Sequence, residues 1–160
     1  MTIQVILAVV FDTVAAAVLL LAFARGGRPE RLGGLINLAG LVASTAVRLI
    51  APTIGWAPGA ASILAIDLCV ASGFFWLGAT TVRFWPIWAA GFAVANLFMS
   101  VCGALLPRVP LFAYHTGLGI YAYLALGALA LGTLRLGADA EPHIRHGSRR
   151  SWIDQLKETS

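Results

Sequence analysis

Charged residues are scarce in this chain. Only 11% of its 160 residues are Asp, Glu, Lys or Arg, whereas 59% are hydrophobic. Soluble globular domains carry about 25% charged residues, so the composition excludes an ordinary water-soluble domain. The solvent that fits this composition is hydrocarbon rather than water.

Cysteine is nearly absent, and the patterns that carry enzyme or metal chemistry are missing. Cys69 and Cys102 fall in different apolar segments, and no C-x-x-C spacing exists, so neither a disulfide nor a zinc site is expected. The sequence contains no G-x-S-x-G, H-E-x-x-H, P-loop or dinucleotide-binding glycine motif. No basic stripe interleaved with aromatic residues indicates nucleic acid as a partner. We therefore expect no catalysis, and the sequence identifies no cofactor.

Long apolar segments separated by short polar breaks recur along the chain. A hydrocarbon layer roughly 30 Å thick requires about 20 helical residues, and segments of this length are too long for the alternating strands of a membrane barrel. The sequence therefore predicts an all-α integral membrane bundle of five transmembrane helices. Their approximate ranges are 2–24, 32–51, 59–82, 86–106 and 111–134.

The connections between these segments are short, so consecutive helices should run antiparallel and pack as neighbours. Short loops rich in Lys and Arg stay in the cytoplasm. An external N-terminus and a cytoplasmic C-terminus place all of the 11 cations except Arg48 and Arg108 on the cytoplasmic side. We therefore predict this orientation.

The expected location is the inner (plasma) membrane of a bacterium, in a multi-pass arrangement. Arginine far outnumbers lysine, and alanine and glycine are abundant, which is typical of proteins from GC-rich bacterial genomes. The first segment is not expected to be a cleaved signal, because Met1–Val5 carries no positive charge and Asp12 interrupts the apolar run.

The composition turns polar after the fifth segment, so residues 135–160 are expected to form a cytoplasmic tail. Ser151 and Asp154 have the spacing of a capping box, which predicts a short helix at about 151–158. We expect a solvated tail; the alternative is that this helix docks against the membrane or a partner. Its candidate docking residues are Trp152, Ile153 and Leu156.

Several polar residues interrupt the apolar segments. Ionisable groups at membrane depth are energetically costly, so they usually face the interior of the bundle, find partners there and mark functional sites. We therefore predict an intramembrane polar cluster. Its members are Asp12, Arg48, Asp67, Asn96 and His115.

The partners within this cluster can be narrowed down. The second and third segments are joined by a short hairpin, so Arg48 can pair with Asp67; alternatively, its long side chain extends to the external headgroups. Asp12 has no cation at its depth on its own helix, so it is either neutral and hydrogen-bonded or a proton carrier. His115, near a helix end, is expected to be a packing residue rather than a ligand.

The stretch RFWPIWAAGF at residues 83–92 resembles a segment, R-[FY]-W-P-[IL]-W-A-A-G-F, of short uncharacterised alphaproteobacterial membrane proteins. A glutamine often follows Gly-Phe in that family, whereas this chain has Ala93. The resemblance implies a bacterial membrane protein and no activity. Independently of it, Trp85 and Trp88 are expected at the cytoplasmic interface and Trp56 at the external one.

These features favour a non-enzymatic accessory or structural subunit of a larger membrane complex, with the lipid bilayer and other membrane subunits as partners. Small residues at a spacing of four recur in several segments, and they allow close helix contacts, either within the chain or with another subunit. Two alternatives are a small transporter or proton-coupled carrier that uses the polar cluster, and a membrane binder of lipid, quinone or pigment.

Overall fold

The structure, a computed structural model, describes residues 3–50, 61–105, 111–137, 140–149 and 152–153. Within these ranges the chain is helical and forms no strand; Thr81 and Ser148 make an isolated bridge. The all-α prediction is thus confirmed for this part of the chain. The helices are α1 (Ile3–Arg25), α2 (Arg28–Ile50), α4 (Ala61–Thr80), α5 (Trp85–Leu105), α6 (Leu111–Leu134) and α7 (Pro142–His146).

Three of the described helices are long and apolar enough to cross a membrane. They are α2, α4 and the Trp85–Cys102 part of α5. The described part of α6 adds a shorter apolar stretch, Gly119–Leu134. The prediction of membrane-length apolar helices is confirmed to this extent.

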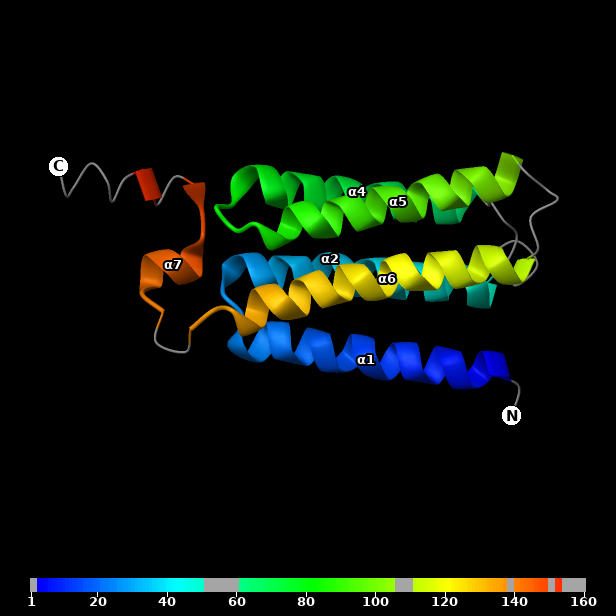
Figure 1. Cartoon of the computed structure of the whole chain (residues 1–160), viewed down its shortest axis with the longest axis horizontal. Coiled ribbons are helices and arrows are strands. Elements are labelled where there is room, and N and C mark those ends of the chain that lie inside the picture. The colour runs from blue at the N-terminus through cyan, green and yellow to red at the C-terminus, as the bar shows by residue number, and fades with distance from the viewer. Residues whose placement is uncertain (1–2, 51–60, 106–110, 138–139, 150–151, 154–160) are drawn as a thin grey trace.

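The five long helices lie side by side, and consecutive ones run in opposite directions (Figure 1). The chain order determines most neighbours: α5 packs against α4 and α6, and α2 packs against α4. The first helix, α1, packs against α6 and α2. The short α7 lies beyond one end of the bundle, where α1, α4 and α6 finish and α2 and α5 begin (Figure 1). We call this end the α7 end.

Trp85 lies at the centre of the packing near the α7 end. Its ring rests against Gly33 of α2 and Gly132 of α6, where any side chain would overlap with it. Phe74 of α4 meets the ring edge-on, with centroids 6.3 Å apart. Trp85 is therefore buried between helices rather than exposed on the outside of the bundle, because glycines on two other helices make room for it. Trp88 is exposed, and Trp56 lies outside the described residues.

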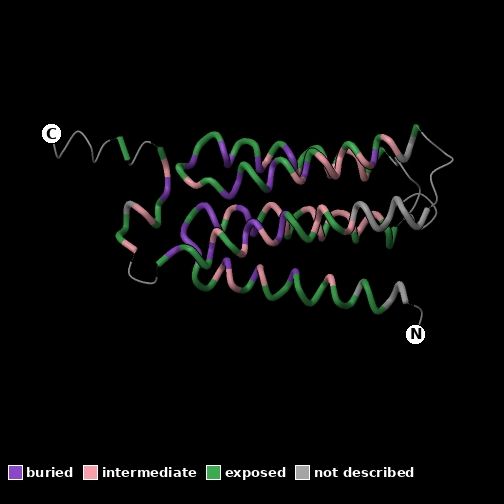
Figure 2. Tube along the Cα trace, in the orientation of Figure 1, coloured by how far each residue is buried: buried purple, intermediate pink, exposed green. Residues whose placement is uncertain are grey.

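Many large apolar side chains are exposed on the outer surface of the bundle. Leu49 is 77% exposed, Phe75 72% and Leu105 73%. Buried residues concentrate on the inner faces and toward the α7 end (Figure 2). A soluble protein rarely exposes apolar patches of this extent, so this surface is suited to contact with lipid.

Replacement of Gly132 by alanine tests the position of Trp85. The new methyl group would overlap with the indole ring, so we expect Gly132→Ala to lower the free energy of unfolding by about 1–3 kcal/mol. The control is Gly127→Ala on the same helix, where an added methyl group meets no atom within 4 Å. Alanine favours a helix over glycine, so this control should be at least as stable as the wild type. Thermal unfolding in one detergent measures both, and equal stability of the two variants would contradict this packing.

Candidate functional site

A fully buried carboxylate, that of Glu30, stands at the α7 end. It belongs to the first turn of α2, which follows two glycines and contains Pro29 at a position where the missing N–H has no helical partner. Gly27 caps this helix, because its carbonyl accepts the N–H of Arg31 at 3.1 Å. Glu30 Oε2 accepts the N–H of Gly27 at 2.9 Å, as the third helical residue of a capping box does. Local sequence thus turns the carboxylate back toward the α1–α2 connection.

The other oxygen of Glu30 connects α2 with the start of α5. Glu30 Oε1 accepts a hydrogen bond from Trp85 Nε1 at 3.1 Å. Arg83 Nε lies 3.6 Å from the same oxygen, which is an ion pair but too long for a hydrogen bond. A buried carboxylate requires such partners, because an uncompensated charge away from water is strongly destabilising. We call Glu30, Arg83 and Trp85 the Glu30 junction.

The tail around α7 is fastened to the Glu30 junction. Arg83 Nη2 donates to the carbonyl of Ile144 at 2.9 Å, and the N–H of Val82 donates to the carbonyl of Gly147 at 3.0 Å. Gly147 has a φ of 60° and lies against the ring of Pro29, so a residue with a side chain would be strained and crowded there. The beginning of the tail therefore docks onto its own chain.

Two of the three predicted docking residues at the end of the tail lie within the described part of the chain. Trp152 and Ile153 are exposed, and Leu156 lies outside the described residues. The N–H of Trp152 donates to the carbonyl of Ser148 at 3.3 Å, which has the spacing of a helical turn. Most of the predicted helix at 151–158 also lies outside the described ranges.

Within the helices, Asp67 of α4 meets Ser100 of α5. Ser100 is buried, and its hydroxyl donates to Asp67 Oδ2 at 3.1 Å. Asp67 is also attracted electrostatically by Arg48 of α2; the Arg48 side chain is exposed. The structure thus brings two of the five predicted residues, Asp67 and Arg48, into interaction, and it adds Ser100.

Two other predicted members of the polar cluster are placed less fully. Asn96 is half-buried on α5, one helical turn before Ser100 and therefore on the same side of the helix. His115 belongs to α6, and only its backbone lies among the described atoms.

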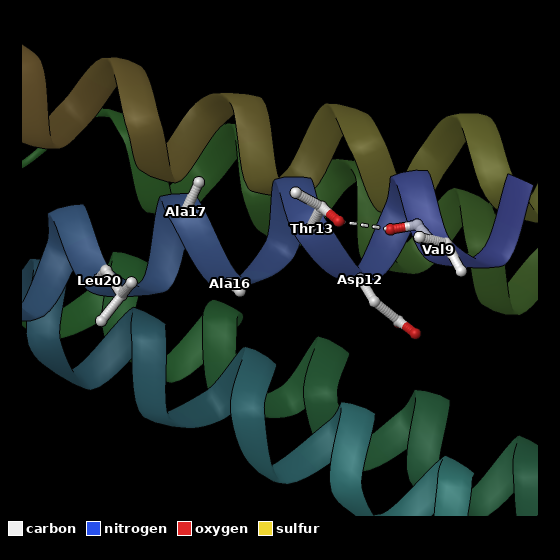
Figure 3. Close-up of a pocket in the computed structure, with 6 residues that line it drawn as sticks. All are labelled: Val9, Asp12, Thr13, Ala16, Ala17 and Leu20. Atoms are coloured by element: carbon white, nitrogen blue, oxygen red, sulfur yellow. Dashed lines mark hydrogen bonds between the residues drawn. The ribbon is translucent and has the colours of Figure 1, made fainter. Parts of the chain in front are cut away.

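Asp12 does not face the interior of this chain, which corrects the expectation for this residue. It is exposed on α1 and lines a shallow groove on that helix, where its carboxylate points away from its own ribbon (Figure 3). The neighbouring Thr13 satisfies its hydroxyl locally, by donating to the carbonyl of Val9 at 2.7 Å. We call this surface the Asp12 face; the residues that line it are Val9, Asp12, Thr13, Ala16, Ala17 and Leu20.

Metal-binding chemistry finds no support in the described part of the chain. No three His, Cys, Asp or Glu side chains come together there in a way that could hold a metal ion. Cys69 and Cys102 are both free thiols. The polar groups that do meet are hydrogen-bonded or ion-paired, which is the arrangement of groups that fix helix positions.

The Glu30 junction and Ser100 were not among the site residues predicted from the sequence. Glu30 and Arg83 belong to short polar connections, where an exposed position is the usual expectation. The available signals were local: Glu30 stands three residues after a helix-capping glycine, and Ser100 stands four residues after Asn96.

Comparison with known proteins identifies no relative. No family model, no curated protein and no solved structure matches this chain. The geometry described above is therefore the basis for a functional proposal.

Replacement of Glu30 tests the junction. Glu30→Ala removes the acceptor of Trp85 Nε1 and the partner of Arg83, so the free energy of unfolding should fall by about 3–5 kcal/mol. Glu30→Gln keeps one acceptor oxygen and should fall between Glu30→Ala and the wild type. The control Arg149→Gln changes an exposed charged side chain at the same end and should stay within about 0.5 kcal/mol of the wild type. Denaturant titration in micelles measures all three, and a Glu30→Ala protein as stable as the control would refute the junction.

Ser100→Ala tests the contact between α4 and α5. Loss of its hydroxyl leaves Asp67 without this donor, so we expect a destabilisation of about 1–3 kcal/mol. Ser72→Ala alters an exposed hydroxyl on α4 and should change stability by less than about 0.5 kcal/mol. Thermal melting followed by tryptophan fluorescence separates the two; melting temperatures that coincide would argue against the Asp67–Ser100 hydrogen bond.

Proposed function

We propose that this protein is a non-enzymatic accessory subunit of a membrane complex, and that its Asp12 face receives a transmembrane helix of another subunit. In this proposal α1, α2, α4, α5 and α6 all cross the inner membrane of a bacterium. The start of α1 is external, and the α7 end is cytoplasmic. The observation that carries the proposal is the exposure of Asp12 on an otherwise apolar helix.

The depth of Asp12 makes its exposure costly. It is the tenth residue of α1, and a rise of 1.5 Å per residue places it about 14 Å from the start of the helix. This depth is near the middle of a hydrocarbon layer about 30 Å thick. A carboxylate there costs about 2.5–3.5 kcal/mol on insertion scales. A second helix that supplies a hydrogen-bond donor or a cation would remove this cost.

The shape of the Asp12 face suits a helix. Its residues recur at intervals of three and four, so they form one stripe along α1. Thr13, Ala16 and Ala17 are small and lie next to Asp12 in the groove (Figure 3). Small residues allow two backbones to approach closely in lipid. The other sides of α1 already pack against α6 and α2.

Charge complementarity favours a different protein over a second copy of this chain. In a symmetric dimer each residue near the axis meets its own copy, so two Asp12 carboxylates would approach and repel each other. A helix of another subunit with Lys, Arg, His, Asn or Ser at the same depth meets the requirement without repulsion. The occupant that we propose is such a helix.

The carrier alternative is less favoured by the geometry. A proton-coupled carrier requires its polar residues to line one wet cavity. Asp67 bonds to Ser100 between α4 and α5, whereas Asp12 is exposed on α1, which packs on α2 and α6. These positions support separate structural roles for the two carboxylates.

The Asp12 face can be tested with a photo-crosslinking residue at Ala16, and with the same residue at Val14 as a control, because Val14 is exposed on α1 but does not line the face. Crosslinking in native membranes should join the Ala16 position to one membrane protein and should spare the Val14 position. Asp12→Leu should reduce the yield of this crosslink about tenfold or more, which corresponds to about 1.4 kcal/mol.

The same experiment separates the competing outcomes. Asp12 makes no internal contact that the fold requires, so purified Asp12→Leu should melt no lower than the wild type. A crosslink between two copies of this chain would replace the proposed partner by a dimer. A crosslink yield that is unchanged in Asp12→Leu, or a chain that remains monomeric after mild extraction, would refute the proposal.

A further inference from the structure

We propose that the α7 end holds a binding pocket for the phosphate of an anionic phospholipid headgroup. A pocket of about 530 Å³ lies between the first turns of α2 and the segment around α7. Its charged lining comes from both sides: Arg28 and Arg31 from α2, and Arg145 and His146 from α7. We call it the basic pocket. The inference rests on the membrane placement of α2 in the proposed function, but it does not require the partner helix.

The charge of the basic pocket is of one sign. Three guanidinium groups line it, and no carboxylate does so among the described residues. Glu30 is close in sequence but is buried and occupied by Gly27, Trp85 and Arg83, so it does not neutralise the arginines from within the pocket. Guanidinium groups bind phosphate oxygens through paired, charge-assisted hydrogen bonds. The ligand must therefore be an anion, and phosphate is the anion that this geometry suits best.

The two walls of the basic pocket are held together before any ligand binds. Arg28 Nη1 lies 3.1 Å from His146 Nε2, and since arginine can only donate, the imidazole nitrogen accepts. The α7 wall is also anchored through the contacts of Arg83 with Ile144 and of Val82 with Gly147. A site held in this way loses little entropy on binding.

The apolar side of the basic pocket distinguishes a lipid from a free phosphate. Leu32 and Leu35 line it together with the arginines, and they lie one turn below Arg28 and Arg31 on the same side of α2. Leu35 is 50% exposed. Farther along α2, Leu38 and Val42 are also exposed. Basic pockets at the cytoplasmic ends of transmembrane helices are typical sites for anionic headgroups, and here an acyl chain could follow the leucines.

Native mass spectrometry of the full chain from nanodiscs tests the basic pocket. The nanodiscs contain phosphatidylcholine with an increasing fraction of phosphatidylglycerol. The wild type should retain the anionic lipid, and Arg28→Gln with Arg31→Gln should reduce the retained amount about tenfold. The control is Arg25→Gln with Arg135→Gln, which removes two exposed cations near the same end that do not line the pocket. In the control, the amount of retained anionic lipid should fall less than twofold.

Two further variants control for misfolding and identify the ligand. Arg31→Gln alone leaves the Arg28–His146 contact intact, so it should lose lipid without loss of stability. Leu35→Asn should weaken lipid retention but leave unchanged any thermal shift with inorganic phosphate.

Each outcome bears on the inference. Equal lipid loss in both arginine pairs would show a diffuse surface charge and would overturn it. Binding of inorganic phosphate without retention of phosphatidylglycerol would overturn the lipid assignment. If lipid is lost while the Ala16 crosslink persists, the pocket and the Asp12 face act independently; if lipid is retained without any crosslink, only the proposed subunit role fails.

Discussion

The buried carboxylate of Glu30 is the constraint on which the arrangement of the helices depends. Its three partners come from two separate parts of the chain: the N–H of Gly27 lies just before α2, and Arg83 and Trp85 lie at the start of α5. Arg83 in turn binds the carbonyl of Ile144 in α7. In lipid no hydrophobic effect draws helices together, so close packing and polar contacts decide which helices are neighbours. A charge that must be compensated therefore permits one register of α2 and α5 and excludes others.

The packing around Trp85 makes this constraint specific. The indole can reach Glu30 only because Gly33 and Gly132 leave room for its ring between α2 and α6. Its N–H would otherwise be an unsatisfied donor in an apolar interior, which is costly. Shape and hydrogen bonding thus select the same position for one side chain. Agreement between shape and hydrogen bonding distinguishes a unique fold from a loosely packed bundle.

The sequence was sufficient for the class of fold, because apolar segments of membrane length must satisfy their backbone groups as helices. It was insufficient for Trp85, because the two glycines that admit the ring belong to other helices. It also misplaced Asp12. The helix α1 is apolar on nearly all sides, so its sequence contains little information about which face turns inward. The burial of Glu30 could not be predicted from the local sequence either, because its partners Arg83 and Trp85 lie more than 50 residues away in the chain.

In the proposed topology the Asp12 face and the basic pocket differ in membrane depth, and depth restricts which partner each can bind. In that topology Asp12 lies near the middle of the bilayer. Only another helix can bring a donor to it there, because lipid tails have none and an unfolded segment would leave its own backbone unsatisfied. At the α7 end, Arg28 and Arg31 lie at the start of α2, which the same topology places where headgroup phosphates are abundant and acyl chains begin. A protein with both surfaces would be held in a defined orientation by lipid at one end while it binds a partner at its centre. That combination fits a subunit that positions other helices, since Glu30 and Asp67 are already engaged with partners inside this chain.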